Sequence, residues 1–267
     1  MFETFRLLNR FYSRETKGSL LFHKTLTYGH YFVFNSLSLF LPRNFVKHIF
    51  RNYVRIGFLP MKVTLKDGIV INHHLEHYGP FFEVILSDEY MLRELRPNSV
   101  VVDVGANIGL VSILSSKRFG AKKVISYEPC SDNFRLLKKN VEENHCHNVF
   151  LNNVAVSDQE GQIKLHLHGP GTHSINEKRP AKHYETVRMT TLDKSLASER
   201  SIDFLKIDVE GAELAVLKGA TKTLKKTRRL IMEWTTLCSH EKILEILKKN
   251  GFEVDVRDNL LYAKKRH

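Results

Sequence analysis

The chain has 267 residues, which is enough for one α/β domain and an extension. Its composition, 42% hydrophobic and 26% charged, is that of an ordinary globular protein, and the sequence contains no internal repeat and no low-complexity run. The formal net charge of +12 favours an anionic partner, such as a membrane surface, a nucleic acid or an acidic glycan.

Residues 1–60 are predicted to form a basic, aromatic-rich helical extension. The first 62 residues carry ten Lys or Arg and two Asp or Glu, and 14 of the 27 aromatic residues lie within the first 60 positions. In the last part of this segment apolar residues recur at i, i+3 and i+4, while Lys47, Arg51 and Arg55 form a separate basic stripe. We interpret the extension either as a helical cap over the main domain or as an element that contacts an anionic membrane peripherally.

The sequence predicts a cytoplasmic protein. The stretch YFVFNSLSLFLP, residues 31–42, is apolar but shorter than the roughly 20 residues of a membrane-spanning helix, and it lies beyond the usual place of a signal peptide. The three cysteines, Cys130, Cys146 and Cys238, form no C-x-x-C pair and are interpreted as reduced thiols.

A β-hairpin and a lead-in helix are expected in residues 61–98. In the stretch KVTLKDGIVIN, apolar and polar residues alternate on both sides of Asp67 and Gly68, which are typical of a tight turn.

Residues 99–267 are predicted to form an α/β domain, because buried strands alternate with amphipathic helices. A mostly parallel sheet with helices on both faces and a closing hairpin at its edge follows from this alternation. The expected strands are SVVVDV, KKVISYEP, NVFLNNVAV, DFLKIDV and RLIMEW, with two more in residues 161–191 and a final hairpin of FEVDV and LLYAKK. The expected helices are IGLVSILSSKRF, SDNFRLLKKNVEEN with Ser131 or Asp132 as its cap, GAELAVLKGATKTL, and SHEKILEILKKNG.

The loop DVGANIG, residues 103–109, joins the first of these strands to the first helix. It lacks the third glycine of the dinucleotide fingerprint G-x-G-x-x-G and the Lys-Ser or Lys-Thr of a Walker A loop, so it suits phosphates poorly. Asp103 at the strand end suits a cationic group, and Glu128 at the end of the second strand can accept hydrogen bonds from both hydroxyls of a ribose. Gly105 and Gly109 allow close approach of the backbone. A cationic nucleoside without phosphate, S-adenosylmethionine, fits these features.

A second group of candidate residues lies in DFLKIDVEGAE, residues 203–213. Lys206 and Asp208 are two apart on a strand and therefore point to the same side, and Asp208 ends the strand beside the expected ligand. Glu210 and Glu213 are expected on one face at the start of the next helix, either as residues of the acceptor site or as helix caps.

The segment GPGTHSI, residues 169–175, lies in the insertion after the third strand, where loops that contact substrates occur. His173 and Ser174 are therefore candidates for contact with the acceptor, with an ordinary polar loop as the alternative. Two pairs of closely spaced histidines elsewhere lack a third ligand at a suitable spacing, so no metal site is predicted.

Five stretches occur in the order DVGANIGLVSILSS, YEPCSDNFRLLKKNVEEN, NVAVSDQEG, TTLDK and IDFLKIDVEGAELAVLKGA. Together they resemble the FkbM family of S-adenosylmethionine-dependent methyltransferases over residues 78–235, and the pairing of D-x-G-A-N-x-G with K-I-D-x-E-G-x-E is specific to that family. The resemblance implies a class I methyltransferase fold, Rossmann-like with seven strands, and methyl transfer from S-adenosyl-L-methionine to a hydroxyl oxygen. It places the cofactor contacts on Asp103, Gly105, Asn107, Ile108, Gly109, Glu128, Asp208 and the backbone near Ala155.

The expected acceptor is a hydroxyl of a sugar, glycan, lipid or lipid-linked glycan, or secondary metabolite. Its oxygen must lie about 3 Å from the methyl group and must lose its proton. Asp208 or Glu210 is the first candidate for the base and His173 the second, while Lys206 would hold a carboxylate or stabilise a developing alkoxide.

Two alternatives remain. The basic extension suggests a nucleic-acid methyltransferase, but enzymes that methylate base amino groups resemble N/D-P-P-[YF] after the fourth strand, where this chain has DVEG. A binding module that has lost catalysis is the other alternative, and the intact Asp103, Glu128 and Asp208 argue against it.

Overall fold

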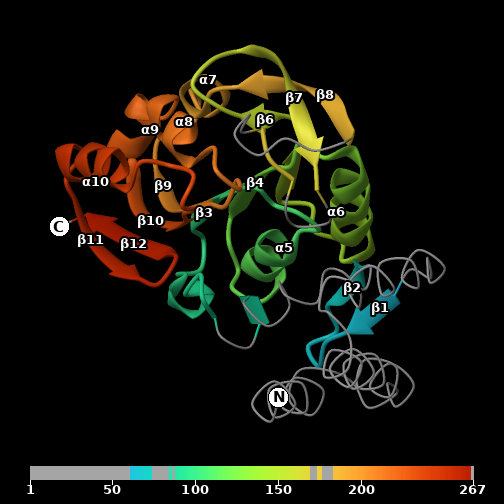
Figure 1. Cartoon of the computed structure of the whole chain (residues 1–267). Coiled ribbons are helices and arrows are strands. Elements are labelled where there is room, and N and C mark those ends of the chain that lie inside the picture. The colour runs from blue at the N-terminus through green and yellow to red at the C-terminus, as the bar shows by residue number, and fades with distance from the viewer. Residues whose placement is uncertain (1–60, 74–83, 86–87, 169–172, 176–182, 266–267) are drawn as a thin grey trace, which may run out of the picture. The chain divides into compact units, whose positions relative to one another are not determined.

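The computed structural model describes residues 61–73, 84–85, 88–168, 173–175 and 183–265 (Figure 1). The chain divides into two units, one ending at Ser87 and one beginning at Asp88. The predicted N-terminal extension, with its basic stripe, lies outside the described residues, so both the cap and the membrane contact stay predictions.

In the first unit the predicted β-hairpin is confirmed. Strand β1 (Met61–Thr64) pairs with β2 (Val70–His73) in antiparallel register, from Met61 opposite His73 to Thr64 opposite Val70. The turn is closed by the amide of Leu65 donating to the carbonyl of Ile69 at 2.7 Å. Val63, Leu65, Ile69 and Ile71 are buried, as the sequence pattern requires, and the polar Asn72 and His73 are buried as well.

The second unit is built on a seven-stranded sheet. Its strands, in spatial order, are β11 (Phe252–Arg257), β12 (Leu260–Lys265), β10 (Thr227–Glu233), β9 (Ile202–Ile207), β3 (Val100–Val104), β4 (Lys123–Tyr127) and β5 (Val149–Asn152). Neighbours from β10 to β5 are parallel, whereas β12 is antiparallel to both β10 and β11. The expected mostly parallel sheet with a hairpin at its edge is confirmed.

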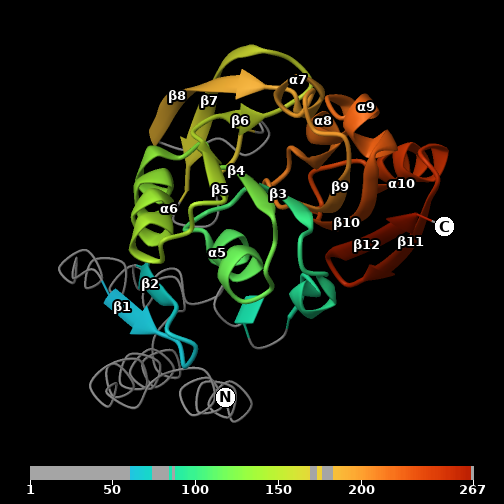
Figure 2. The ribbon, with the colours of Figure 1, turned by 180° about the vertical axis from the view of Figure 1, so that it is seen from behind.

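Helices cover both faces of this sheet, as expected. On one face lies α5 (Leu110–Lys117), whose Ser112 hydroxyl bonds to Asp103 of β3 and Ser126 of β4, with α6 (Ser131–Glu143) beside it. On the opposite face, apolar side chains of α7 (Leu192–Ser195), α8 (Glu213–Lys218), α9 (Thr221–Lys225) and α10 (His240–Lys249) join those of the strands in the main core. Figures 1 and 2, seen from opposite sides, both place α5 across the sheet from α8 and α9.

A smaller three-stranded sheet lies between β5 and β9 in the chain. Its order is β6 (Ala155–Val156), β8 (His183–Thr190) and β7 (Gly161–Leu167), with β7 and β8 antiparallel. Its buried side chains form a second core with Cys130. The strand, loop and strand expected in residues 161–191 are confirmed.

The order of the strands determines where a ligand binds. The chain runs from β3 to β4 and β5 in one direction and then returns to β9 on the other side of β3. Open α/β sheets bind ligands at such a reversal, beyond the carboxyl ends of the strands. Val104 pairs with Ile207 there, so Gly105 and Asp208 leave the sheet side by side.

Two expected elements are divided in the structure. The strand expected at residues 148–156 is two strands, β5 and β6, which belong to different sheets. The helix expected at residues 211–224 is interrupted between α8 and α9, where the amides of Lys222 and Thr223 donate to the carboxylate of Asp193 at 2.9 and 2.7 Å. In both cases contacts distant in sequence overrule a continuous local pattern.

The cap expected for the helix at 131–144 is wrong as well. The helix begins at Ser131, and its N-cap is Cys130, whose side chain forms no capping hydrogen bond. Instead, the amide of Ser131 donates to Glu185 of β8 at 2.9 Å. The lead-in helix expected before residue 98 is represented in the described residues by the short 3-10 helix η3 (Leu92–Glu94).

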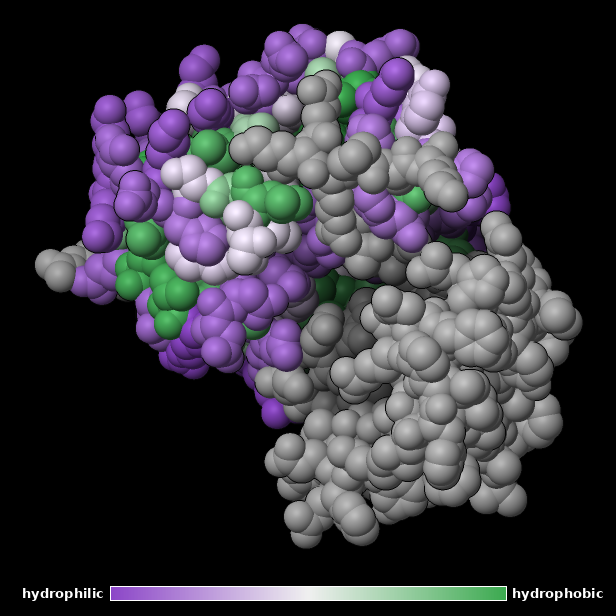
Figure 3. Space-filling view, in the orientation of Figure 1, coloured by the Kyte–Doolittle hydropathy of each residue, from purple (hydrophilic) through white to green (hydrophobic). Residues whose placement is uncertain are grey.

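The described surface is mainly hydrophilic on the face shown in Figure 3, with smaller groups of hydrophobic residues between the polar ones. The large hydrophobic side chains exposed in the described part are Phe150, Tyr184 and Val256, which lie on three different strands. All three cysteines are free thiols. None of the helices formed by the described residues is long and apolar enough to cross a bilayer.

Candidate functional site

The glycine loop after β3 is held against the neighbouring strands. The amides of Gly105 and Ala106 donate to the carbonyl of Tyr127 at 3.0 and 2.9 Å. Gly105 has φ +78° and lies so close to Asp208 that a Cβ would overlap its carbonyl oxygen. Gly109, with φ +92°, packs closely against Leu137 of α6. Both positions therefore require glycine, as the sequence indicated.

Glu128 follows β4 and holds the loop from the other side. Its Oε2 accepts the amide of Asn107 at 2.8 Å, and its Oε1 accepts the amide of Cys130 at 2.9 Å. Burial, only partly offset by these hydrogen bonds and by Lys206, raises the pKa of Glu128 to about 7. The carboxyl group is thus fixed at the end of its strand, where the sequence placed the ribose contact.

A charged cluster lies between the ends of β3 and β9. Lys206 Nζ is 3.4 Å from Asp103 Oδ1 and 3.4 Å from Asp208 Oδ2, and it donates to the carbonyl of Gly105 at 2.6 Å. Burial alone would lower the pKa of Lys206, but Asp208 and Asp103 outweigh it and raise the pKa. Lys206 is therefore a buried cation that joins both carboxylates to the glycine loop. The sequence predicted that Lys206 would hold a carboxylate in this way.

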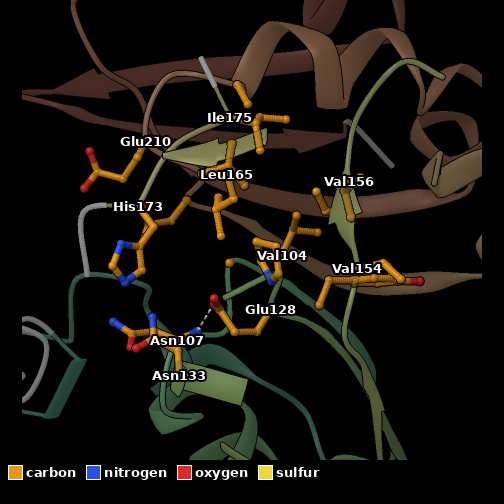
Figure 4. Close-up of a pocket in the computed structure, with 17 residues that line it drawn as sticks. Val104, Asn107, Glu128, Asn133, Val154, Val156, Leu165, His173, Ile175 and Glu210 are labelled. Carbon is orange, nitrogen blue, oxygen red and sulfur yellow. Dashed lines mark hydrogen bonds between the residues drawn. The ribbon is translucent and has the colours of Figure 1, made fainter. Parts of the chain in front are cut away.

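These elements enclose a pocket, shown in Figure 4. Its lining comprises Val104, Gly105, Asn107, Tyr127, Glu128, Pro129, Asn133, Val154, Ala155, Val156, Leu165, His173, Ile175, Asp208, Val209, Glu210 and Ala212. In Figure 4 the imidazole of His173 points toward Asn107 and Asn133, while Val154, Val156, Leu165 and Ile175 form an apolar wall. Burial lowers the pKa of His173, which favours the neutral imidazole. The pocket thus combines an apolar side with a polar side.

The pocket brings together seven of the candidate residues and leaves six out. Those that line it are Gly105, Asn107, Glu128, Ala155, His173, Asp208 and Glu210. Those that do not are Asp103, Ile108, Gly109, Lys206, Ser174 and Glu213. Asp103 is fully buried and Ile108 almost so, which makes both of them supports of the loop in this structure.

The turn after β9 differs from expectation. Glu210 and Glu213 do not share a helix face, because α8 begins only at Glu213 and Glu210 has a left-handed φ of 53° in the preceding turn. Glu213 is buried, and its Oε1 accepts the amide of Gly211 at 2.8 Å. Ser174, also buried, donates to the carbonyl of Glu210 at 2.5 Å. Glu213 and Ser174 therefore brace the turn that presents Glu210.

One residue of the site has no sequence signal. Tyr90, 3% exposed, directs its hydroxyl to Asp208 Oδ2 at 3.3 Å and to Glu233 Oε2 at 3.5 Å, and Lys206 Nζ lies 5.4 Å from its ring centre. Asp208 Oδ2 thus faces both Tyr90 and Lys206, whereas no contact within the described residues engages Oδ1. The Asp208 side chain is 29% exposed and lines the pocket. Tyr90 lies outside every motif, so only the fold reveals it.

Comparison with known proteins agrees with this geometry. The family model described as methyltransferase FkbM domain matches residues 103–254, more than half of the chain. The chain is 28% identical over 253 residues to the AMB antimetabolite synthetase AmbE of Pseudomonas aeruginosa, with 75% of this chain but only 12% of AmbE covered. It is 28% identical over 148 residues to the hexuronic acid methyltransferase AglP of Haloferax volcanii, which covers 54% of this chain and 59% of AglP. It is 25% identical over 204 residues to the 2-O-methyltransferase NoeI of Sinorhizobium fredii, which covers 64% of this chain and 80% of NoeI.

The matched residues begin at Asp103 and run through Glu128, Lys206 and Asp208, so the match contains the glycine loop and both charged strand ends. The family resemblance seen in the sequence, the class I methyltransferase fold and S-adenosyl-L-methionine as the cofactor are confirmed. The chain belongs to the FkbM family of methyltransferases.

Proposed function

We propose that the protein transfers the methyl group of S-adenosylmethionine to a hydroxyl oxygen of a sugar or glycan. The observation that carries this proposal is the carboxylate of Asp208, which lines the pocket and is held through Oδ2 by Tyr90 and Lys206. The relatives AglP and NoeI, described as acting on hexuronic acid and as a 2-O-methyltransferase, support a sugar hydroxyl as the acceptor.

The pocket residues fit the cofactor. Asn107 Oδ1 and His173 Nδ1 are buried polar atoms that have no hydrogen-bond partner among the described residues, and both residues line the pocket. Buried polar atoms without partners are rare in folded proteins and indicate a ligand that pairs with them. Glu128 would hold the ribose hydroxyls, and the apolar wall that includes Ala155 and Leu165 would take the adenine.

The cofactor, when bound, supplies a methyl group on a positively charged sulfur. Asp103 and Asp208 carry two negative charges against the single positive charge of Lys206, so this cluster has a net charge of −1 when both acids are ionised. A net negative charge in a site with little water stabilises a cation. We assign to this cluster the selection of a cationic ligand, and to Lys206 the fixing of Asp208 and the glycine loop.

The acceptor hydroxyl must lose its proton during transfer. Asp208 Oδ1 is the first candidate to accept it, because a carboxylate held by Lys206 and Tyr90 keeps one orientation toward the pocket. His173 is the second candidate, since burial favours its neutral form, which can accept a proton. Glu210, presented by the braced turn, remains a third.

The test is transfer from S-adenosylmethionine to a panel of methyl glycosides that includes neutral hexosides, deoxyhexosides and hexuronosides. We expect acceptor-dependent formation of S-adenosylhomocysteine and a product heavier by one CH₂ group. Binding of S-adenosylmethionine is measured in parallel by calorimetry. Normal cofactor binding without methylation of any glycoside would contradict the sugar acceptor, and absence of cofactor binding would contradict the assignment of the pocket.

A further inference from the structure

The second unit, which begins at Asp88, contains a second hollow. It lies at one edge of the large sheet, and the candidate active site lies at the opposite edge. The parallel strands β3, β9 and β10 begin at this edge, and the antiparallel β12 ends there. The hollow has a volume of about 610 Å³. Its lining comprises Glu94, Leu95, Arg96, Ser99, Asp203, Arg228, Arg229, Lys264 and Lys265. None of these residues takes part in the methyl-transfer site, and we call this feature the rear hollow.

The fold brings two basic runs of sequence together here. KKTRR, residues 225–229, leads into β10, and KK, residues 264–265, ends β12. Because these strands are antiparallel, the start of one lies beside the end of the other, and Arg229 is directly opposite Lys264 in the register. Like charges directly opposite each other destabilise a sheet, and here Glu94, 2.8 Å from Arg229, offsets part of the repulsion.

The acidic residues of the rear hollow do not balance its cations. Five Lys or Arg line it, against two carboxylates. Glu94 is 2.8 Å from Arg229, and Asp203 is 3.5 Å from Arg228 and also accepts the amide of Val100 at 2.8 Å. Both carboxylates are therefore engaged, and the lining keeps a net charge of +3. Lys264 also has an acidic neighbour in β11, because Glu253 is its register partner there. Glu253 does not line the hollow.

Two of the cations are partly removed from water. Burial lowers the pKa of Arg229, although Glu94 opposes this, and burial also lowers the pKa of Lys265. Among the described residues, Lys265 Nζ donates to the backbone carbonyl of Lys225, at 2.6 Å. The guanidinium groups of Arg96 and Arg228 carry paired donors that match the oxygens of phosphate groups, whereas that of Arg229 is engaged by Glu94 and by the carbonyl of Met91. No described residue of the lining is aromatic, so none could stack on a base.

We propose that the rear hollow binds a phosphate-bearing ligand through Arg96, Arg228 and Lys264. The shared chemistry is a phosphate or diphosphate group, which a free metabolite and the headgroup of an anionic lipid both carry. The inference concerns a site remote from methyl transfer and is independent of the proposed acceptor.

The test compares two double variants of the full chain. R96Q with K264Q removes one Arg and one Lys from the rear hollow, and both side chains are exposed, so the fold is expected to persist. R135Q with K139Q removes the same two residue types from the exposed face of α6 and is the matched control. Calorimetric titration with inorganic pyrophosphate gives the first readout at constant ionic strength. Sedimentation with phosphatidylcholine vesicles, with and without phosphatidic acid, gives the second, and binding of S-adenosylmethionine verifies that each variant is folded.

We expect saturable binding of one pyrophosphate per chain, weakened at least tenfold by the rear-hollow variant and less than twofold by the control. Sedimentation with phosphatidic acid vesicles that is lost only in the rear-hollow variant would support the same chemistry with a lipid as its source. Equal weakening in both variants, or no saturable binding of either probe, would overturn the proposal.

Discussion

Replacing Lys206 by Met would test the charged cluster most directly. Met has a similar length but no charge, so the substitution leaves Asp103, which is fully buried, beside Asp208 without their shared cation. Removing one partner of a buried ion pair costs about 3–5 kcal/mol, because the remaining charge stays buried. Asp208 is 29% exposed and can be partly solvated, so most of the loss arises at Asp103. We therefore expect the free energy of unfolding to fall by about 3–5 kcal/mol.

The assay is urea unfolding followed by the fluorescence of Trp234, the single tryptophan of the chain. K194M is the control, since Lys194 forms an ion pair of 2.6 Å with Glu160 in which the side chains are 67% and 51% exposed, and exposed pairs contribute about 0–1 kcal/mol. If Lys206→Met fails to fold, the double variant D103N with K206M is expected to regain stability, because it removes the buried charge as well. A loss below about 1 kcal/mol in K206M, or a double variant no more stable than K206M, would refute the reasoning.

Four further predictions concern the same site. The pKa of Glu128 is about 7 in the folded protein, above its ordinary value of 4.5, so the folded state binds the carboxyl proton more tightly than the unfolded state does. The free energy of unfolding should therefore fall as the pH rises between these two values. Urea unfolding across this range should show a smaller fall for Glu128→Gln, and equal slopes would contradict the prediction. Gly105→Ala should cost at least about 2 kcal/mol, because its Cβ would meet the Asp208 carbonyl, whereas Gly68→Ala, with an equally left-handed φ but open space, should cost about 1 kcal/mol in thermal unfolding. Asp208→Asn should lower turnover about 10²-fold with a smaller effect on cofactor affinity. Tyr90→Phe should lower turnover less and be coupled to Asp208→Asn in a double-mutant cycle; additive effects would show that Tyr90 does not act through Asp208.

Those parts of the fold that depend on neighbouring residues could be predicted from the sequence. The strand before Gly105, the hairpin around Gly68 and the need for Gly109 all follow from local patterns, and the order of motifs indicated the family. Contacts between distant segments explain the errors. The helix expected at residues 211–224 is interrupted where Asp193 of α7 accepts the amides of Lys222 and Thr223.

The same reason applies to the candidate site. Asp208 and Glu128 were found because they end strands whose pattern is clear. Tyr90 was missed because its contacts with Asp208 and Glu233 span 118 and 143 residues, and nothing next to it in the sequence marks them. Glu213 was predicted either as a residue of the acceptor site or as a helix cap, and its carboxylate accepts the amide of Gly211 in the turn before α8.

The small sheet has a consequence for how this protein could acquire a new substrate. Its strands β7 and β8 are held in fixed register from Gly161 opposite Met189 to Leu167 opposite His183, and Leu165 forms part of the pocket wall. Residues 168–182 connect these two strands and contain His173. Gly105 and Glu128 are held in place by other parts of the chain. Ile175, in the same segment, also lines the pocket, so we expect substitutions there to alter the space offered to an acceptor while the paired strands keep Leu165 in place. The small sheet would then act as a fixed frame on which acceptor choice can diverge.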